Sequence, residues 1–415
     1  MRTLKRFFST AIVAGALSLG GCTDWLAVEN PNVIDNAALD PVADAALLAK
    51  SAQQNFASAY GHLIVYSSWF VGETDVSETF PTRNEFGRRD ITIQNGSLDT
   101  DVWFPLSQTV ASAYLVLDAT LPNPTTNINY ARVNLFLGFA YVFMAEQFCQ
   151  GAVRAGPPLT TIAMLDSAVA HFNDAITQGT GAGGEGLILA NAARVGIARA
   201  ELQAGRLANA IAAANAVPAG FSYSLSYIDD LAQRFRLANR MWFYVRDRGS
   251  IAVNPVWRST NSDTLRIKWL VQGTYAPQDA AYSSDRGVPY AIQQKYPDYN
   301  VPVRLASKLE ADYIVAEAQG TAAQGALIDA RRAAFGQGAF TFTNPDSVMT
   351  EFLRQKGLDF YLEGKRMGDF RRHPTNIIGL PVPGSTYWKP GFAPVGNNVC
   401  YPLPITETDN NPNFP

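Results

Sequence analysis

The chain has 415 residues, of which 47% are hydrophobic and 17% are charged, and its formal net charge is −3. This weakly acidic balance lacks the clustered basic charge that nucleic-acid binding requires, so the sequence predicts no nucleic-acid partner. It also argues against an electrostatic attachment to anionic lipid.

Residues 1–21 have the pattern of a signal peptide. A positive n-region (Arg2, Lys5, Arg6) precedes an apolar stretch that is too short to span a bilayer. The stretch ends in Leu-Gly-Gly-Cys, which has the form of a lipobox with Cys22 as the lipidated residue. The alternative is an ordinary secretory signal with a chance cysteine. We expect a mature chain that begins at Cys22, carries a net charge of about −6 and is held at a membrane by acyl chains.

Residues 22–41 are rich in Asn, Pro and Asp and show no periodicity, which predicts an extended tether. Residues 42–415 are expected to form a single domain without a second apolar span. Two further cysteines, Cys149 and Cys400, permit one disulfide in an oxidising compartment, and the alternative is two separate buried thiols.

Apolar residues at three- and four-residue spacing predict a first helix over residues 41–66. The periodicity is lost over residues 70–100, which predicts a long loop. Helices are then predicted over residues 100–121, where Pro122 ends the second helix, and over residues 128–149.

The middle third is rich in alanine and predicts three further helices. The first starts near Leu165, the second spans residues 187–203, and the third starts near Leu207. A later pair is predicted over residues 309–319 and 325–335. Alternating helices with small residues at their crossing points are typical of tetratricopeptide-like hairpin arrays, in which each hairpin buries the face that its neighbour leaves open.

The predicted fold is therefore mostly α, with a helical core at about residues 42–230 and 305–372. Irregular segments are predicted at about 70–100, 235–300 and 373–415. Such long irregular segments in a compact protein are usually functional surfaces, and we expect them to form a loop-rich, ligand-facing half.

Residues 350–372 combine an apolar helical face with Gly364, which can end a helix in a left-handed conformation. Arg366 and Asp369 are placed to pair or cap around that break. On physical grounds alone this segment predicts a structural corner.

The same segment carries a family resemblance. Its run LDFYLEGKRMGDFRR (residues 358–372) resembles the C-terminal signature of the SusD/RagB family of nutrient-uptake lipoproteins. The run LEADYIVAEA (309–318), the Pro- and Asn-rich end (401–413) and the lipobox followed by Trp25-Leu26 resemble other parts of that family, in the same order.

The resemblance implies an outer-membrane lipoprotein, usually exposed at the cell surface, with a tetratricopeptide-like core. It also implies a partnership with a SusC-like TonB-dependent transporter, to which the protein passes glycans or other nutrients. The chain is short for the family, from which we expect trimmed loops on the ligand-facing side.

Aromatic residues in the irregular segments suit saccharide binding, because a sugar's C–H face packs on an indole or phenol ring while polar groups bind its hydroxyls. Core packing or contact with the transporter is the alternative for each aromatic residue. The candidate ligand-binding residues are Trp69, Asp75, Arg83, Trp103, Trp257, Arg258, Trp269, Tyr275 and Tyr282.

The sequence shows no catalytic motif, cofactor signature or metal-ligand spacing, and its three histidines, His62, His171 and His373, are far apart. We therefore expect a binding protein that is not an enzyme. Two alternatives remain: a membrane-tethered glycan hydrolase, whose paired carboxylates can come from distant segments, and a tetratricopeptide-like module that binds only proteins.

Overall fold

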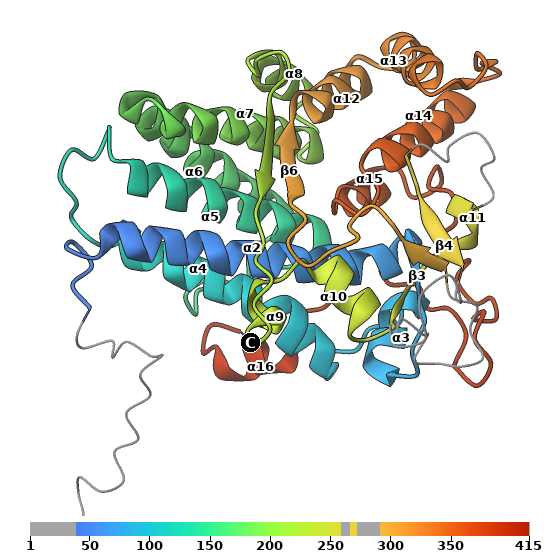
Figure 1. Cartoon of the computed structure of the whole chain (residues 1–415), viewed down its shortest axis with the longest axis horizontal. Coiled ribbons are helices and arrows are strands. Elements are labelled where there is room, and N and C mark those ends of the chain that lie inside the picture. Colours follow the sequence, from blue (N-terminus) through green and yellow to red (C-terminus); the bar gives the residue numbers. More distant parts are fainter. Residues whose placement is uncertain (1–38, 259–265, 272–290, 415) are drawn as a thin grey trace, which may run out of the picture. The chain divides into compact units, whose positions relative to one another are not determined.

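A long helix, α2 (Ala45–Phe70), is surrounded by other elements in the computed structural model, which describes residues 39–258, 266–271 and 291–414 (Figure 1). Its first half buries one face, with Ala45, Leu48, Ala52 and Phe56 at helical spacing. Its second half is buried on every side, as its run of apolar residues requires. Helix α2 is thus the element against which the rest of the fold packs.

The other long helices pack on one another largely in chain order (Figure 1). They are α4 (Phe104–Leu117), α5 (Ile128–Gln147), α6 (Thr161–Ala182), α7 (Glu185–Gln203), α8 (Leu207–Asn215), α12 (Lys308–Gln319), α13 (Thr321–Ala334) and α14 (Pro345–Asp359). Helix α12 joins the array by packing on α7 and α8 across a long gap in sequence. The mostly α, tetratricopeptide-like arrangement is confirmed.

Small residues bring these helices close together. The ring of Phe172 on α6 lies against Gly138 of α5 and Gly196 of α7, and a Cβ atom at either glycine would collide with that ring. The close approach of three successive helices therefore depends on missing side chains, as the alanine- and glycine-rich composition predicts.

Helix α5 is long and apolar enough to cross a membrane, but 89% of its 18-residue apolar stretch is buried among the described residues. Two of its buried polar side chains are paired inside the fold: Glu146 accepts from Arg199 (2.7 Å) and Asn134 donates to Gln178 (2.9 Å). This pairing and burial identify α5 as a core helix.

The strands of the described residues form three short antiparallel pairs, two of which join segments that are distant in sequence. The pairs are β1 (Thr74–Val76) with β3 (Ile251–Val253), β2 (Ser222–Leu225) with β6 (Val303–Ser307), and β4 (Trp269–Val271) with β5 (Ala291–Gln293). The pairing of β1 with β3 brings residues near 75 beside residues near 254.

The segments predicted to be irregular contain short helices, so that part of the prediction is wrong in detail. These helices are α3 (Pro81–Arg88), α9 (Arg234–Leu237), α10 (Arg240–Arg246), α11 (Pro255–Arg258) and α16 (Ile405–Asn410), whereas the π-helical turn η2 (Leu98–Trp103) lies at the start of the helix predicted from residue 100. Each is too short to show a helical period, and local signals start several of them. Pro81 occupies the first turn of α3, and the Asn239 side chain caps α10 by accepting from Met241 N (2.9 Å).

The predicted corner between α14 and α15 (Arg366–Arg372) is present, and Gly364 has φ 64°, as expected. The expected pairing of Arg366 with Asp369 is wrong. Asp369 Oδ1 accepts from Lys356 Nζ of α14 (2.6 Å), whereas Arg366 Nε donates to the carbonyl oxygen of Val71 after α2 (3.0 Å). The two side chains bind different elements and hold the corner against both.

Cys149 and Cys400 form a disulfide in the structure, with their Cα atoms 5.2 Å apart. Backbone hydrogen bonds support the same contact: Cys149 N donates to Tyr401 O (2.9 Å) and Tyr401 N donates to Gln147 O (2.7 Å). The C-terminal tail is therefore joined to the end of α5.

The described residues from Pro41 onward form one compact unit. The predicted signal peptide, Cys22 and nearly all of the predicted tether lie outside the described residues.

Candidate ligand-binding site

A cavity of about 280 Å³ combines an exposed indole ring with charged and amide groups. Its lining residues come from three segments: Asp75 lies in β1, Asn254 follows β3 directly with Pro255 and Arg258 next to it in α11, and Trp388 lies in the C-terminal tail. The pairing of β1 with β3 places the first two segments together. Because the lining is concave and partly apolar and has few polar groups, it suits a small polar ligand.

Asp75 presents a fixed carboxyl group to this cavity. The Asn254 side chain donates to Asp75 Oδ1 (2.7 Å), and its own carbonyl oxygen accepts from Val256 N (3.0 Å). Burial raises the pKa of Asp75 to about 6, although the Asn254 hydrogen bond and the charge of Arg258 act to lower it. At neutral pH the group is an ionised acceptor whose position is set by Asn254.

Trp388 is 43% exposed, whereas the residues on either side of it are buried. Lys389 donates to the carbonyl oxygens of Val76 (3.4 Å) and Glu78, and Tyr387 lies against Gly87. The two neighbours anchor the tail, so the indole is held in place and loses little entropy when it contacts a ligand.

Three of the predicted tryptophans are buried in the protein interior. Trp69 is packed edge-on against Tyr66, with ring centroids 4.9 Å apart. Trp103 donates to a Glu407 carboxylate oxygen (3.1 Å), and Trp257 donates to the Gly72 carbonyl oxygen (2.9 Å). Their ring faces are covered by protein, so these three tryptophans pack in the core and do not contact a ligand.

The other predicted residues divide between the cavity and the rest of the chain. Asp75 and Arg258 both line the cavity. Arg83 is buried and pairs with Glu78 (2.9 Å), away from the lining, and Trp269 is half-buried on β4. Tyr275 and Tyr282 lie outside the described residues.

Sequence reasoning missed Asn254 and Trp388, although a signal was present for the second. Trp388 lies in a tail rich in proline and glycine that the sequence marks as a functional surface. Asn254 also lies in a segment marked in this way, but its place beside Asp75 depends on the β1–β3 pairing, which the sequence does not show.

A second cavity, of about 320 Å³, also contains exposed aromatic rings. Phe104, the first residue of α4, and Phe235 of α9 are 55% and 52% exposed, and Asn55, Gln108 and Arg236 contribute polar groups. This cavity contains none of the predicted ligand residues.

The histidines occupy different environments. Burial lowers the pKa of His62 well below its ordinary value, and burial lowers the pKa of His171 to about 4. Both rings are therefore neutral at physiological pH. Among the described residues, no group of three or more His, Cys, Asp or Glu side chains is arranged to hold a metal ion.

The sequence matches no family model. It also matches no curated protein. Solved structures, however, share its fold over nearly the whole chain. A SusD superfamily protein from Parabacteroides distasonis aligns with 90% of this chain and 98% of its own, at 14% identity and a TM-score of 0.66.

Two further structures agree with the first. A SusD-like carbohydrate binding protein from Bacteroides vulgatus aligns with 90% of this chain and 97% of its own, at 13% identity and a TM-score of 0.65. Surface glycan-binding protein A from Bacteroides uniformis aligns with 88% of this chain and 98% of its own, at 14% identity and a TM-score of 0.58. The protein therefore has the SusD-like fold, and the resemblance seen in the sequence is confirmed at that level. The alignments extend over 97–98% of each of these three structures.

Proposed function

We propose that this protein is a cell-surface lipoprotein of the SusD/RagB family that captures a glycan and passes it to a SusC-like TonB-dependent transporter in the outer membrane. The SusD-like fold supports the family assignment, because it extends over about nine-tenths of the chain. Two of the similar proteins are named for carbohydrate or glycan binding, and one of these for a surface location.

The observation that carries the glycan proposal is the anchored indole of Trp388 beside Asp75, Asn254 and Arg258. A sugar ring offers an apolar C–H face that packs on an indole, and its hydroxyls can donate to a carboxylate and accept from a guanidinium. Both kinds of group lie in one cavity of about 280 Å³, which is close to the lower end of the usual size for small-ligand sites.

The lining of the same cavity favours binding over hydrolysis. Most glycosidases use two carboxyl groups about 5–10 Å apart, one on each side of the scissile bond. Asp75 is the one carboxyl group among the described residues that line this cavity. We therefore assign Asp75 to the binding of hydroxyl groups.

The test is a glycan titration of residues 23–415, in which tryptophan fluorescence and calorimetry report binding to a panel of neutral and acidic oligosaccharides and peptides. We expect one class of oligosaccharide to bind and Trp388→Ala to weaken it by about tenfold or more, because a lost ring contact of about 1.4 kcal/mol corresponds to tenfold. Phe104→Ala, which removes another exposed ring, from the second cavity, is the matched control and should bind normally.

A loss of binding in Phe104→Ala but not in Trp388→Ala would move the site to the second cavity. If only peptides bind, the ligand in the proposal would be a peptide nutrient and not a glycan. Cleavage products after overnight incubation would favour the hydrolase alternative.

A further inference from the structure

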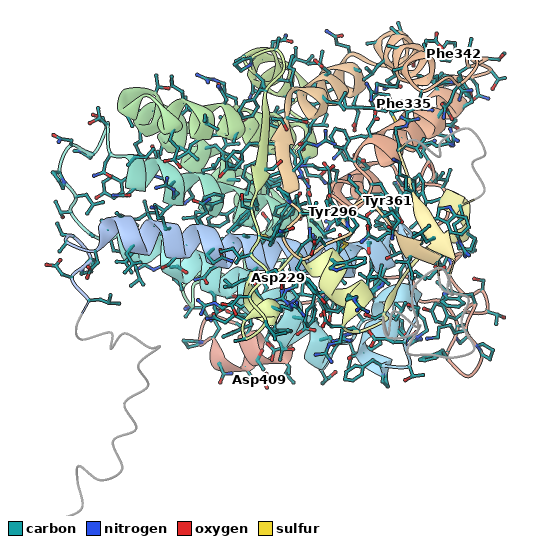
Figure 2. The ribbon with its side chains drawn as sticks, viewed as in Figure 1. Asp229, Tyr296, Phe335, Phe342, Tyr361 and Asp409 are labelled. Atoms are coloured by element: carbon teal, nitrogen blue, oxygen red, sulfur yellow. A yellow bond between two sulfur atoms is a disulfide. The ribbon has the colours of Figure 1, made fainter. Side chains whose placement is uncertain are left out.

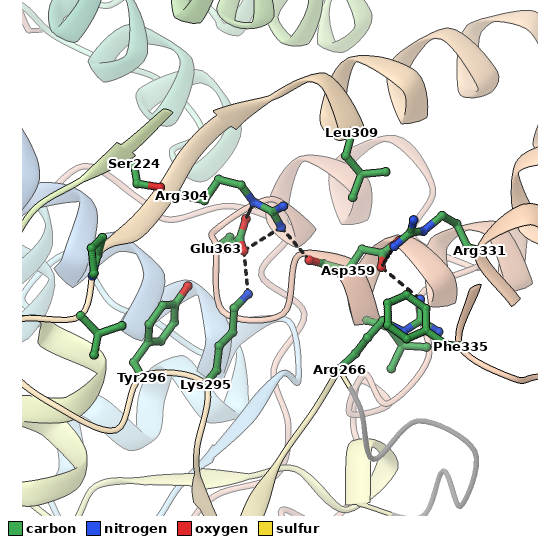
Figure 3. Close-up of a pocket in the computed structure, with 13 residues that line it drawn as sticks. Ser224, Arg266, Lys295, Tyr296, Arg304, Leu309, Arg331, Phe335, Asp359 and Glu363 are labelled. Carbon is green, nitrogen blue, oxygen red and sulfur yellow. Dashed lines mark hydrogen bonds and ion pairs between the residues drawn. The ribbon is translucent and has the colours of Figure 1, made fainter. Parts of the chain in front are cut away.

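A third cavity, of about 460 Å³, has six charged side chains among the thirteen residues that line it and shares no lining residue with the Trp388 site. Tyr296 and Phe335, labelled in Figure 2, both line it, as does Ser224 of β2. Its charged lining residues are Arg266, Lys295, Arg304, Arg331, Asp359 and Glu363 (Figure 3).

The two carboxylates of this cavity are already satisfied by the protein. Arg331 donates to both oxygens of Asp359 (2.8 Å each), and Arg266 adds a third contact (3.1 Å). Glu363 accepts from Lys295 (2.6 Å) and from Arg304 (2.9 Å to each oxygen). Figure 3 shows these ion pairs as two clusters side by side along the cavity.

Positive charge exceeds negative charge in this lining. Arg266 has a further interaction of its own and is left out of the balance, and the other three basic side chains (Lys295, Arg304 and Arg331) still outnumber the two carboxylates. Two of these three are guanidinium groups, which stay protonated in proteins. Burial acts to raise the pKa of Glu363, but Lys295 and Arg304 outweigh that effect and hold its pKa below the ordinary value. Since both carboxylates are shared among these cations, positive charge is left over for a ligand.

Two guanidinium groups also have unused donors that face solvent. Arg304 uses Nε and Nη2 to bind Glu363 and the Asp359 carbonyl oxygen, and Arg331 uses Nε and Nη2 to bind Asp359. No hydrogen bond of either Nη1 group is found within the described part of the chain, although the Tyr313 hydroxyl lies near the Arg331 guanidinium, and the side chains are 26% and 22% exposed. The ring of Phe335 supports Arg331 from one side, with its centroid 5.2 Å from the guanidinium carbon.

We infer that this cavity is a second binding site, which takes a small ligand bearing a carboxylate, sulfate or phosphate group. Such an anion would accept from the Nη1 groups of Arg304 and Arg331 and offset the surplus charge. Both guanidinium groups are already fixed by their carboxylates, so little side-chain entropy is lost when the anion binds. The inference does not depend on the Trp388 site, because the two cavities share no lining residue.

Ser224 offers a test that removes none of these contacts. It is exposed, lines the cavity and lies opposite Arg304 in the β2–β6 pair. Ser224→Glu would place a carboxylate next to the unused donors of Arg304 and compete with a bound anion. Ser222→Glu is the matched control, since Ser222 is an exposed serine of the same strand that does not line the cavity.

The experiment is calorimetry at low ionic strength with galacturonate, inorganic sulfate and inorganic phosphate, and with galactose as the neutral probe. We expect at least one anion to bind to the wild-type chain while galactose does not. Ser224→Glu should weaken the binding of that anion by about tenfold or more, and Ser222→Glu should bind it like the wild type. The anion that binds most tightly indicates whether the natural ligand bears a carboxylate, a sulfate or a phosphate group.

Arg331→Gln provides a second readout, because Asp359 keeps Arg266 and Tyr313 as partners when Arg331 is lost. This variant should also bind the anion more weakly while its thermal unfolding stays cooperative. The inference is overturned if no anion binds better than galactose, or if Ser222→Glu weakens binding as much as Ser224→Glu does.

Discussion

Glu73 is a carboxyl group held almost completely out of water, just after α2. Its side chain is 1% exposed, and its Oε1 atom accepts from the Leu362 backbone N–H (3.1 Å). Burial raises the pKa of Glu73 to about 7, although Arg366 and the Leu362 hydrogen bond act to lower it. Because the folded-state pKa exceeds the unfolded value, the stability that protonated Glu73 contributes is complete below about pH 4.5 and is lost as pH rises through about 7.

We predict that Glu73→Gln removes this dependence on pH. The glutamine keeps an acceptor for the Leu362 N–H and stays neutral at every pH, so the variant does not lose this stability as pH rises. The free energy of unfolding of the variant, minus that of the wild type, should therefore increase from pH 5 to pH 8. The expected increase is at most about 3 kcal/mol, at roughly 1.4 kcal/mol per pKa unit. Urea unfolding across this range measures it, with the exposed Asp409→Asn as control. Parallel stability curves for Glu73→Gln and the wild type would contradict the prediction.

The candidate residues could be predicted only in part, because burial of an aromatic side chain is decided by tertiary packing. Trp257 and Trp388 both lie in segments without long helices, yet one is 1% exposed and the other is 43% exposed. Asp75 and Arg258 were chosen as polar partners and do reach one cavity. The ring that accompanies them was not chosen, since it comes from the far end of the chain.

The long helices were predictable, because each carries enough turns for its apolar period to appear in the sequence. Helices α2, α5 and α7 therefore lie close to the predicted ranges. Short elements such as α3 and α10 have only one or two turns, and their formation depends on caps and on contacts with α2. The pairing of the strands was not predicted, since two of the three pairs join segments that are distant in sequence.

The link between α5 and the tail supports a prediction at the level of elements. The Cys149–Cys400 bond spans a sequence separation of 251 residues. On the chain-entropy model, a closed loop of that length stabilises the fold by about 5 kcal/mol. The double variant Cys149→Ser, Cys400→Ser should lose stability up to this amount in chemical unfolding, and reduced wild-type protein should behave like it. Equal unfolding midpoints for reduced and oxidised wild type would contradict the prediction.

For the whole molecule, the proposed function requires attachment to a membrane through the N-terminal lipid. We predict that Cys22→Ala moves the protein from the membrane fraction to the soluble fraction when it is expressed in a host that lipidates such signals. The reason is that acyl chains, at about 0.8 kcal/mol per buried CH₂, supply the attachment that a net acidic chain lacks. Cell fractionation and immunoblotting measure it, with Thr23→Ala as control. A Cys22→Ala protein that stays with the membranes would contradict the anchor.

The position of Cys400 near the C-terminal end also limits when the chain can become cross-linked. A chain that emerges from its N-terminus presents α5 and Cys149 long before Cys400 becomes available. The stacked helices must therefore find their packing without help from the bond. Oxidation then acts as a late step, which cross-links helices that are already packed. A chain truncated before Cys400 would fold without this disulfide.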